Sequence, residues 1–336
     1  MKKVALITGI TGMVGSHLAD YLLKNTSWKI YGLCRWRSPQ DNINHLLSLA
    51  NKKKSRLEFI YADINDYSSL ISSLQKTKPN YVFHLAAQSY PLTSFTEGNI
   101  TLETNTIGTY NLLNAIKHLK LNPLIHICSS SEIFGRVEKK KLPINENCSF
   151  HPASPYAISK VGTDLIGRYF YEAFKLRTFI TRMFTHTGPR RGDVFAESSF
   201  AKQIALIEAK KIEPIIKVGN LASLRTYADV RDAVRAYYLL LTKNPKPGEV
   251  YNIGGSYSCT VGEVLKFLLS KTRVKNIRII KDKNRMRPID ADLQIPNTKK
   301  FRLHTGWKPE IKFEKTMIDL LDYWREKVKI QNFLDR

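Results

Sequence analysis

The chain has 336 residues, of which 43% are hydrophobic and 24% are charged, so it has the composition of a globular protein and is long enough for one large domain or two unequal ones. Its formal net charge of +24 would suit a polyanion, but the lysines form short clusters far apart, with no basic helix and no aromatic strip that could stack bases. We therefore expect a solvated, lysine-rich surface that attracts small anionic substrates and no nucleic acid or membrane partner; a polyanion partner is the alternative.

The N-terminal stretch MKKVALITGITGMVG places two lysines before an apolar run, as a signal peptide does. Gly9, Gly12 and Gly15 interrupt the run and no small-residue cleavage site follows, so the pattern predicts a first strand and a turn. No later apolar segment reaches the length that a membrane helix needs.

The four cysteines, Cys34, Cys128, Cys148 and Cys259, form no CxxC pair and have no companion histidines at the spacing of metal ligands. We therefore expect reduced thiols and no metal site. Reduced thiols are typical of a cytoplasmic protein, which is the location we predict.

Short apolar runs alternate with longer amphipathic stretches through the first 185 residues. The runs are KVALIT, KIYGLC, LEFIYA, YVFHLA, LIHICS and TFITRM, and helices are expected near 13–25, 67–76, 98–120 and 156–174. Continuous apolar strands that alternate with helices predict a parallel sheet covered on both faces. The fold class is therefore α/β, a doubly wound parallel sheet of the Rossmann type with ligands beyond the carboxyl ends of its strands.

After residue 186 the pattern changes to loops rich in proline, glycine and arginine. Helices are expected there near 196–211, 229–242, 261–271 and 313–327, and neither a repeat nor a low-complexity linker is present. We predict a dinucleotide-binding domain over 1–185 and a smaller, mixed α/β substrate lobe over 186–336 that packs on the first, with segments that can interleave.

The stretch ITGITGMVGSHL places Gly9, Gly12 and Gly15 directly after the first strand and at the start of the first helix. Such glycines let the backbone approach a pyrophosphate while the N-terminus of the helix faces its negative charge. A glycine triplet alone also fits a plain turn, but its position between a strand and a helix favours a dinucleotide site.

The second strand ends in GLCRWRS, with Arg35 and Arg37 where an acidic residue would hold the ribose hydroxyls of NAD. Arginines there can bind a 2′-phosphate, so we predict NADP in preference to NAD, although the same arginines could be surface charges or meet another phosphate. Asp63, in YADIN at the tip of the next strand, is a candidate for binding the adenine or for capping the following turn.

In SPYAISKVGTDLIGRYF, Tyr156 and Lys160 stand four residues apart and thus on one face of an expected helix. A tyrosine with a pKa of about 10 is a poor base at neutral pH unless a nearby cation favours the phenolate, and Lys160 is placed to supply that cation. The preceding strand ends in HICSSSEIFGRV, where three hydroxyls are followed by Glu132. A carboxylate at that strand tip is an acid/base group, a helix cap or the partner of an arginine.

Taken together, these motifs resemble the extended short-chain dehydrogenase/reductase family over essentially the whole chain. Within that family the sequence is most similar to the GDP-mannose 4,6-dehydratases and the GDP-4-keto-6-deoxymannose reductases. The resemblance rests on TGITGMVGSHL, HLAAQSY, TNTIGTYNLL, SSSEIFG, SPYAISK, HTGPRRG, EPIIKVGNL, RTYADVRDAV and TGWKP. The PRRG and VGNL stretches resemble those of enzymes for GDP sugars, so a GDP-sugar substrate is implied.

The resemblance implies that Tyr156, as phenolate, takes the proton of the sugar 4-hydroxyl while Ser130 hydrogen-bonds the same oxygen and hydride leaves C4 for NADP or NAD. It also implies that Glu132 removes the C5 proton of the resulting 4-ketone and passes it to the leaving C6 hydroxyl. The implied catalytic residues are Ser130, Glu132, Tyr156 and Lys160. The implied cofactor-binding residues are Thr8, Gly9, Gly12, Met13, Gly15, Arg35, Asp63, Ile64, Leu85, Ala86, Ala87, Tyr156 and Lys160. Family members pair through helices of the dinucleotide domain, so we expect a homodimer or a homotetramer.

Arg191, Arg225 and Arg287 are the implied partners of the diphosphate and ribose, since a bidentate guanidinium suits diphosphate charge, although a single arginine is more often part of a surface salt bridge. The full implied substrate-binding set is Ser89, Thr185, Arg191, Lys217, Arg225, Arg287 and Asp290. The chain departs from the family pattern by Ser130 for threonine, Thr185 for asparagine and Asp290 for glutamate. Because Thr185 alters the sugar pocket, GDP-mannose and a GDP-manno-heptose are both candidate substrates.

The predicted reaction is oxidation at C4 of a GDP-manno sugar followed by 4,6-dehydration. The reductase branch also carries a glutamate at the position of Glu132, so the alternative is a net C4 oxidoreductase, either a GDP-sugar 4-dehydrogenase or a 4-keto reductase, that removes no water. A third possibility is a redox-inactive protein that keeps the fold and binds a polyanion. His84, in VFHLAAQSY, is expected to be a core residue with satisfied hydrogen bonds rather than a catalyst.

Overall fold

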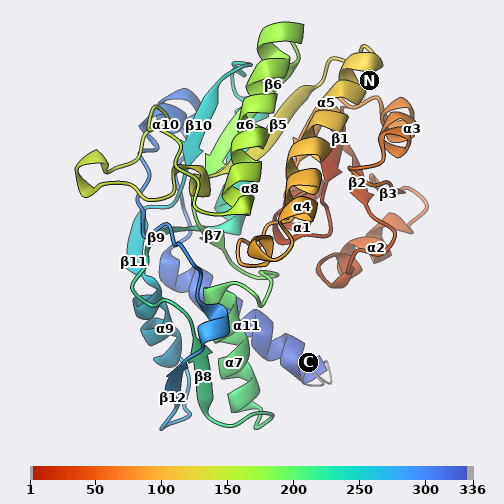
Figure 1. Cartoon of the computed structure of the whole chain (residues 1–336). Helices are drawn as coiled ribbons and strands as arrows, with labels where there is room; N and C mark the ends of the chain where they lie inside the picture. Colours follow the sequence, from red (N-terminus) through yellow and green to blue (C-terminus); the bar gives the residue numbers. More distant parts are fainter. Residues whose placement is uncertain (1–2, 331–336) are drawn as a thin grey trace.

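The computed structural model describes residues 3–330, and its largest feature is a parallel sheet (Figure 1). Within that range seven strands form this sheet in the order β3-β2-β1-β4-β5-β6-β10, and every neighbouring pair is parallel. The strands are β1 (Val4–Thr8), β2 (Lys29–Cys34), β3 (Leu57–Tyr61), β4 (Tyr81–His84), β5 (Leu124–Ser130), β6 (Arg177–Met183) and β10 (Val250–Ile253). The predicted doubly wound sheet is confirmed, because strand order runs outward in both directions from β1.

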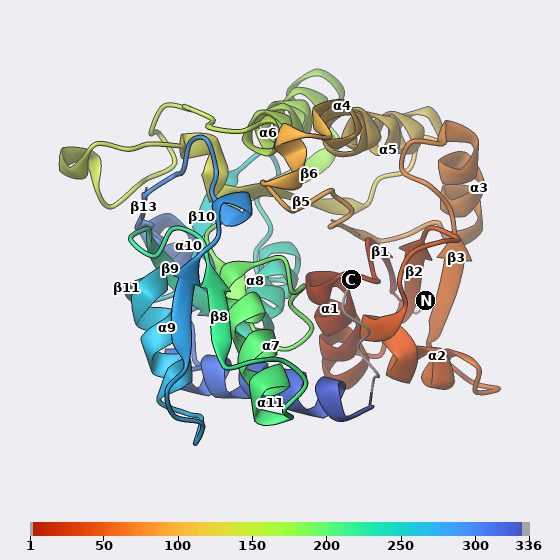
Figure 2. The same ribbon diagram turned by 60° about the horizontal axis from the view of Figure 1, so that its bottom comes forward.

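Helices cover both faces of this sheet, which explains why its strands are apolar on both sides. Figure 2 shows α5 and α6 on one side of the sheet and α1 and α2 on the other. One face carries α1 (Met13–Asn25), α2 (Asn44–Ala50), α8 (Val230–Thr242) and α10 (Lys299–Thr305). The other face carries α3 (Tyr67–Thr77), α5 (Gly108–His118) and α6 (Pro155–Phe174). A short α4 (Gly98–Leu102) and one π-helical turn lead into α5, so the expected helix near 98–120 is divided.

The small lobe is built around β9 (Leu224–Asp229) and lies at the bottom of the view in Figure 1. β9 pairs with β7 (His186–Thr187), β11 (Tyr257–Thr260) and β13 (Leu293–Gln294), while β8 (Ile215–Val218) pairs with β12 (Arg278–Lys281). The helices α7 (Ala196–Glu208), α9 (Val261–Leu269) and α11 (Phe313–Ile330) enclose a separate apolar core with these strands. This core gives the lobe its own hydrophobic stabilisation.

The chain returns from the small lobe to the large sheet. Helix α8 packs on α1, and β10 pairs with β6 from Val250 opposite Ile180 to Ile253 opposite Met183. The two parts of the sequence are thus interleaved in space, and our division at residue 185 stays a prediction. Within residues 3–330 no helix combines the length and the apolar character that crossing a membrane requires.

Candidate active site

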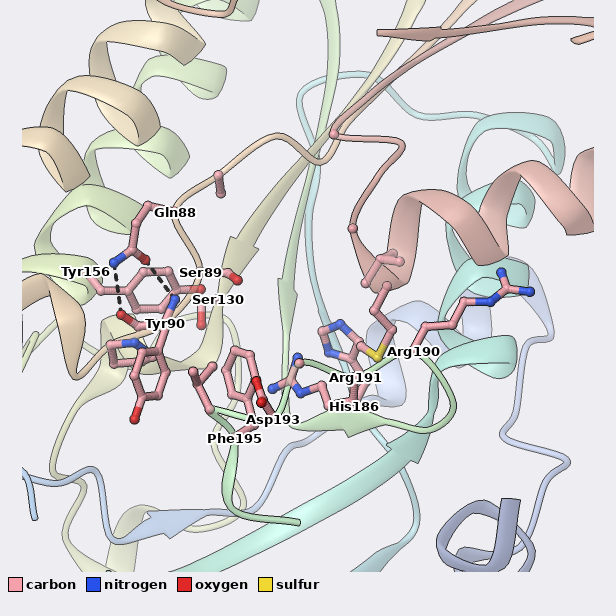
Figure 3. A pocket seen from close by; sticks show the side chains of 18 of the residues that line it. Gln88, Ser89, Tyr90, Ser130, Tyr156, His186, Arg190, Arg191, Asp193 and Phe195 are labelled. Atoms are coloured by element: carbon pink, nitrogen blue, oxygen red, sulfur yellow. Dashed lines mark hydrogen bonds between the residues drawn. The ribbon is translucent and has the colours of Figure 1, made fainter. Parts of the chain in front are cut away.

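A cleft of about 1480 Å³ follows the carboxyl ends of the large sheet and continues along the small lobe (Figure 3). We call the lining from residues 9–15, 35, 63–64 and 85–87 the cofactor half, and the lining from residues 185–197, 219–227 and 285–290 the substrate half. The predicted residues in the lining are Gly9, Gly12, Met13, Gly15, Arg35, Asp63, Ile64, Leu85, Ala86, Ala87, Ser89, Ser130, Glu132, Tyr156, Thr185, Arg191, Arg225, Arg287 and Asp290. Residues far apart in sequence are therefore brought to one cavity.

Four of the residues we singled out lie outside the lining. Thr8 and Lys160 are buried behind the wall of the cleft, where they hydrogen-bond residues of that wall. Lys217 is exposed on β8 and Arg37 is exposed beyond β2. The structure does not bring Lys217 or Arg37 to the cavity.

The glycine turn of the cofactor half is too tight for side chains at two of its positions. Gly9 has φ of +70°, and a Cβ there would lie 2.8 Å from Ala86 Cα. A Cβ on Gly15 would lie 2.3 Å from the Gly9 carbonyl oxygen. Gly12 begins α1 without any side-chain cap, so amides of the first turn lack an intrahelical partner. This uncapped, positive helix end in a glycine cradle fits a dinucleotide diphosphate.

A buried hydrogen-bond chain supports the cofactor half from behind. Thr8 Oγ1 accepts from the amides of Leu85 and Ala86, both at 3.1 Å, and bonds His84 Nδ1 at 2.9 Å. His84 Nε2 bonds Thr109 Oγ1 at 2.9 Å. Burial lowers the pKa of His84 to about 3, so the ring is neutral at pH 7. The prediction that His84 is a satisfied core residue is confirmed.

Tyr156 and Lys160 stand on α6, which begins at Ser154 with a side-chain cap to the Ala157 amide at 3.0 Å. Burial raises the pKa of Tyr156 well above its ordinary value, and the Ser130 hydrogen bond only partly offsets this. Lys160 Nζ donates to the Cys128 carbonyl at 2.8 Å and lies 6.0 Å from the centre of the Tyr156 ring. Burial lowers the pKa of Lys160. In this state Tyr156 is therefore a neutral phenol, and the amino group of Lys160 is hydrogen-bonded to β5.

Glu132 lies on the 3-10 turn Ser131–Phe134 that follows β5. The Ser130 hydroxyl caps this turn by accepting from the Glu132 amide at 3.2 Å. The Glu132 carboxylate meets Arg287, with 3.5 Å between Oε1 and Nη1. An arginine partner was one of the alternatives for this carboxylate, and in the structure it coexists with a position in the cleft.

The substrate half holds a network of opposite charges around Asp290. Its Oδ1 lies 3.0 Å from Arg225 Nη2 and 3.4 Å from Arg287 Nη1. Its Oδ2 accepts from Ser223 Oγ at 2.7 Å and from Asn220 Nδ2 at 3.2 Å. Burial would raise the pKa of Asp290, but the two guanidinium groups, together with the hydrogen bonds from Ser223 and Asn220, hold the pKa below its ordinary value. Asp290 thus fixes two of the three predicted arginines.

The third arginine is held by residues that the sequence reasoning missed. The Arg191 guanidinium carbon lies 3.4 Å from the centre of the Phe195 ring, and Nε lies 3.4 Å from Glu197 Oε1. The Phe195 ring meets the Tyr90 ring edge-on, with centroids 5.5 Å apart (Figure 3). Glu197 is only 5% exposed. No motif marks these positions, because a carboxylate at the start of a helix is ordinarily read as a favourable helix-end charge.

The chain is similar over most of its length to known proteins. The family model described as GDP-mannose 4,6 dehydratase matches residues 6–320. GDP-mannose 4,6 dehydratase 2 of Caenorhabditis elegans is 31% identical over 332 residues, which cover 92% of this chain and 86% of that protein. GDP-6-deoxy-D-mannose reductase of Pseudomonas aeruginosa is 30% identical, covering 98% of this chain and 99% of that protein.

Solved structures give the same result. The structure of RMD from Pseudomonas aeruginosa, which is complexed with NADPH, is 28% identical and superposes with a TM-score of 0.81, covering 97% of this chain and all of that one (100%). The resemblance inferred from the motifs is confirmed. The chain belongs to the GDP-mannose 4,6 dehydratase family of extended short-chain dehydrogenase/reductase enzymes.

Proposed function

We propose that the protein is an NAD(P)-dependent enzyme that oxidises C4 of a GDP-sugar of manno configuration and then removes water across C5 and C6. The observation that supports this most directly is that Tyr156, Ser130 and Glu132 line the same cleft as the arginines of the substrate half. A base, a hydroxyl and a carboxylate thus share one cavity with cations suited to a diphosphate.

The cofactor half suits NAD(P) by its donor set. Gly9, Gly12 and Gly15 leave room for a diphosphate at the start of α1, and Asp63 lines the cleft further along. The chemistry that bound NAD(P) supplies is two-electron oxidation at C4 and a matching two-electron reduction at C6, so the cofactor is regenerated in each turnover. Arg35 is available to a 2′-phosphate, which supports NADP over NAD.

Tyr156 acts as the base at the sugar 4-hydroxyl. Burial opposes the phenolate, so the proton transfer needs positive charge near the ring. Lys160 supplies charge from below and Arg191 from the cleft side, where its field favours the phenolate. Ser130, which hydrogen-bonds Tyr156, is placed to bond the same sugar oxygen.

Glu132 carries the dehydration. A ketone at C4 makes the C5 proton acidic, and the Glu132 carboxylate takes that proton. The protonated carboxyl then gives it to the C6 hydroxyl, whose C–O bond breaks as water leaves. Arg287 orients the carboxylate from the substrate half at 3.5 Å.

The test is a mass spectrum of the product after purified protein is incubated with GDP-mannose and, separately, with a GDP-manno-heptose, each with NAD and with NADP. Loss of the elements of water is the expected result. Glu132→Gln should abolish this loss while exchange of a C4 deuterium label into the cofactor persists. Unchanged water loss in E132Q contradicts the acid/base role.

A net C4 oxidoreductase is the second candidate. The observation in its favour is length, since the Pseudomonas aeruginosa reductase aligns from end to end, at 98% of this chain and 99% of its own. For that activity Tyr156 and Lys160 suffice and Glu132 serves only to bind. Loss of two hydrogens, or turnover only with a 4-keto sugar and reduced cofactor, would select this candidate.

The exposed face of α4, α5 and α6 is the surface through which we propose a homodimer or a homotetramer forms. Large apolar side chains are exposed on these helices and the π turn: Ile100, Leu102, Ile107, Tyr110, Ile158, Leu165, Tyr169 and Phe174. Such a patch usually marks an interface. Light scattering on the wild type and on Leu165→Asp checks this, and a monomeric wild type contradicts it.

We also propose a cytoplasmic location, because the four cysteines are free, as a reducing compartment keeps them. Cell fractionation checks it, and recovery outside the cytoplasm contradicts it.

A further inference from the structure

Two consecutive arginines of the PRRG stretch point in opposite directions. Both line the cleft, and Figure 3 shows the Arg191 side chain directed toward Phe195 and the Arg190 side chain directed the other way, toward α1. Arg190 has φ of +67°, a left-handed conformation that residues other than glycine seldom adopt. Such a backbone conformation persists only where surrounding contacts hold it.

Helix α1 supplies these contacts from two side chains three residues apart. Asp20 Oδ2 accepts from Arg190 Nη1 at 2.7 Å, a charge-assisted hydrogen bond. His17 Nε2 lies 3.0 Å from the Pro189 carbonyl oxygen. Residues i and i+3 share one face of a helix, so the same face of α1 holds the two residues directly before Arg191.

The protonation state of His17 is fixed by its surroundings. The ring is 9% exposed, and burial lowers its pKa to about 4, with Arg190 acting in the same direction. The imidazole is therefore neutral at pH 7, and Nε2 carries the hydrogen, because the Pro189 carbonyl can only accept. The hydrogen bond from His17 to Pro189 therefore requires the tautomer with hydrogen on Nε2.

The segment is also held from its other side. The Ser198 hydroxyl of α7 donates to the Arg191 carbonyl oxygen at 2.7 Å. The backbone on both sides of the Arg191 Cα is thus tied down, to α1 through residues 189 and 190 and to α7 through its own carbonyl. The guanidinium, by contrast, has a loose partner in Glu197 at 3.4 Å.

We propose that Asp20 and His17 are positioning residues that hold Arg191 in place for the diphosphate of the GDP-sugar. The proposal deepens the proposed function and rests on it. It links the two halves of the cleft through one element, since α1 presents its N-terminus to the cofactor half and its side to the substrate half. Neither residue touches the reacting atoms.

The experiment measures binding of GDP and of GDP-mannose by calorimetry, with kcat and KM beside it. Asp20→Asn should raise the Kd of GDP and the KM of the sugar nucleotide about tenfold, since a charge-assisted bond is lost, while kcat stays within about twofold. His17→Phe should act in the same direction. His17→Gln, whose amide can replace the Nε2 donor, should bind GDP nearly as the wild type does.

The decisive comparison uses Arg191→Ala. If Asp20 acts through Arg191, Asp20→Asn adds no further loss of GDP affinity in the R191A background. An equal loss in both backgrounds, or an unchanged Kd in D20N alone, overturns the proposal. Binding of NADP, measured separately, should not change in D20N.

Two control variants separate loss of the bond between Asp20 and Arg190 from the general effect of removing a polar or charged side chain. Glu208→Gln removes a carboxylate of the same kind, which pairs with Arg325 at 2.7 Å outside the cleft, and it should leave GDP affinity unchanged. His45→Gln removes the other partner of Asp20, at 2.8 Å, together with a 3.4 Å contact to Arg190 Nη2, but it keeps the bond between Asp20 and Arg190, so it should change GDP affinity less than Asp20→Asn does. A wild type that does not bind GDP at all would instead contradict the proposed function.

Discussion

The two halves of the cleft are built by different means. The cofactor half is made mainly of backbone, with glycines at Gly9, Gly12 and Gly15 and a neutral chain of hydrogen bonds through Thr8 and His84 behind it. The substrate half is made of charged side chains. These come from separate segments of the chain, such as Arg225 and Asp290, which lie 65 residues apart.

Because of this difference, the two halves should tolerate different substitutions. A site made of backbone is sensitive to any added Cβ and to loss of the buried support beneath it. A site made of ion pairs can change its ligand by one side chain, and we expect Thr185 and Asp290, which depart from the family pattern, to be positions where this can happen. Tyr156 lines the cleft between the cofactor half and the substrate half, so its reactivity depends on both.

The largest expected effect is at this junction. Tyr156→Phe removes the base and keeps the shape of the site, so kcat should fall about a thousandfold or more. Because charges of the substrate half do not depend on the phenol, the Kd of GDP-mannose should change little. Stopped-flow absorbance of the reduced cofactor and calorimetry check the two quantities.

A matched control is Tyr90→Phe, on the cleft wall beside Phe195. It should retain C4 chemistry. A Y156F enzyme with more than a tenth of wild-type kcat would exclude Tyr156 as the base.

Lowering the pH should destabilise the fold, because four histidines are held in their neutral form by burial. Burial lowers the pKa to about 4 for His17 and His186 and to about 3 for His84 and His126, below the ordinary histidine pKa of about 6.5. The unfolded chain therefore binds these protons first as pH falls. The stability that these histidines contribute is fully present above pH 6.5. It is lost as the pH falls to about 4 for His17 and His186 and to about 3 for His84 and His126, by up to about 1.4 kcal/mol per pH unit for each histidine.

Urea unfolding at a series of pH values measures this loss. Proton uptake on unfolding at pH 5 should approach about four from these histidines, beyond the part due to carboxylates. A free energy of unfolding that stays flat from pH 7 to pH 5 would show that the histidines are not buried as neutral groups.

The contrast between local backbone features and long-range side-chain contacts also explains which parts of the fold could be predicted from the sequence. The sheet strands of the first half and α1, α3 and α6 were predicted nearly to the residue, because apolar runs, glycines and caps are local signals. The return of β10 to β6 was not predicted, since a four-residue strand carries no periodicity.

Within the site, motifs located the residues and left their partners open. The Glu132–Arg287 pair depends on contacts between distant segments, which no spacing in the chain reveals. The direction of Lys160, toward Cys128, is set by burial against β5. Glu197, Phe195 and the Asp20–Arg190 bond were missed because each is an ordinary residue until the fold juxtaposes it with an arginine.

Gly12 and Gly15 of the cofactor half should respond differently to an added Cβ. Gly15→Ala places a Cβ against the Gly9 backbone at 2.3 Å, so it should destabilise the fold by about 1–3 kcal/mol. At Gly12 a Cβ meets only the Gly9 oxygen at 3.4 Å, so Gly12→Ala should fold normally and raise the Kd of NADP about tenfold by crowding the diphosphate. Melting curves and fluorescence titration distinguish the two; equal melting temperatures for both variants would contradict the reading.

The smallest expected effect concerns Arg35, a charged side chain of the cofactor half. Arg35 is exposed, so its attraction for a 2′-phosphate is screened by water and salt. Arg35→Ala should therefore lower the preference for NADP over NAD only about two- to fivefold at 0.1 M salt, and the ratio should shrink as salt rises in the wild type. Arg37→Ala, outside the cleft lining, is the matched control and should leave the ratio of the two kcat/KM values unchanged. A wild-type preference that is lost in R37A and kept in R35A would move the 2′-phosphate from the cleft wall to the surface loop. In that case a side chain outside the cleft lining would select NADP, and the cofactor half would bind only the features that NADP and NAD share.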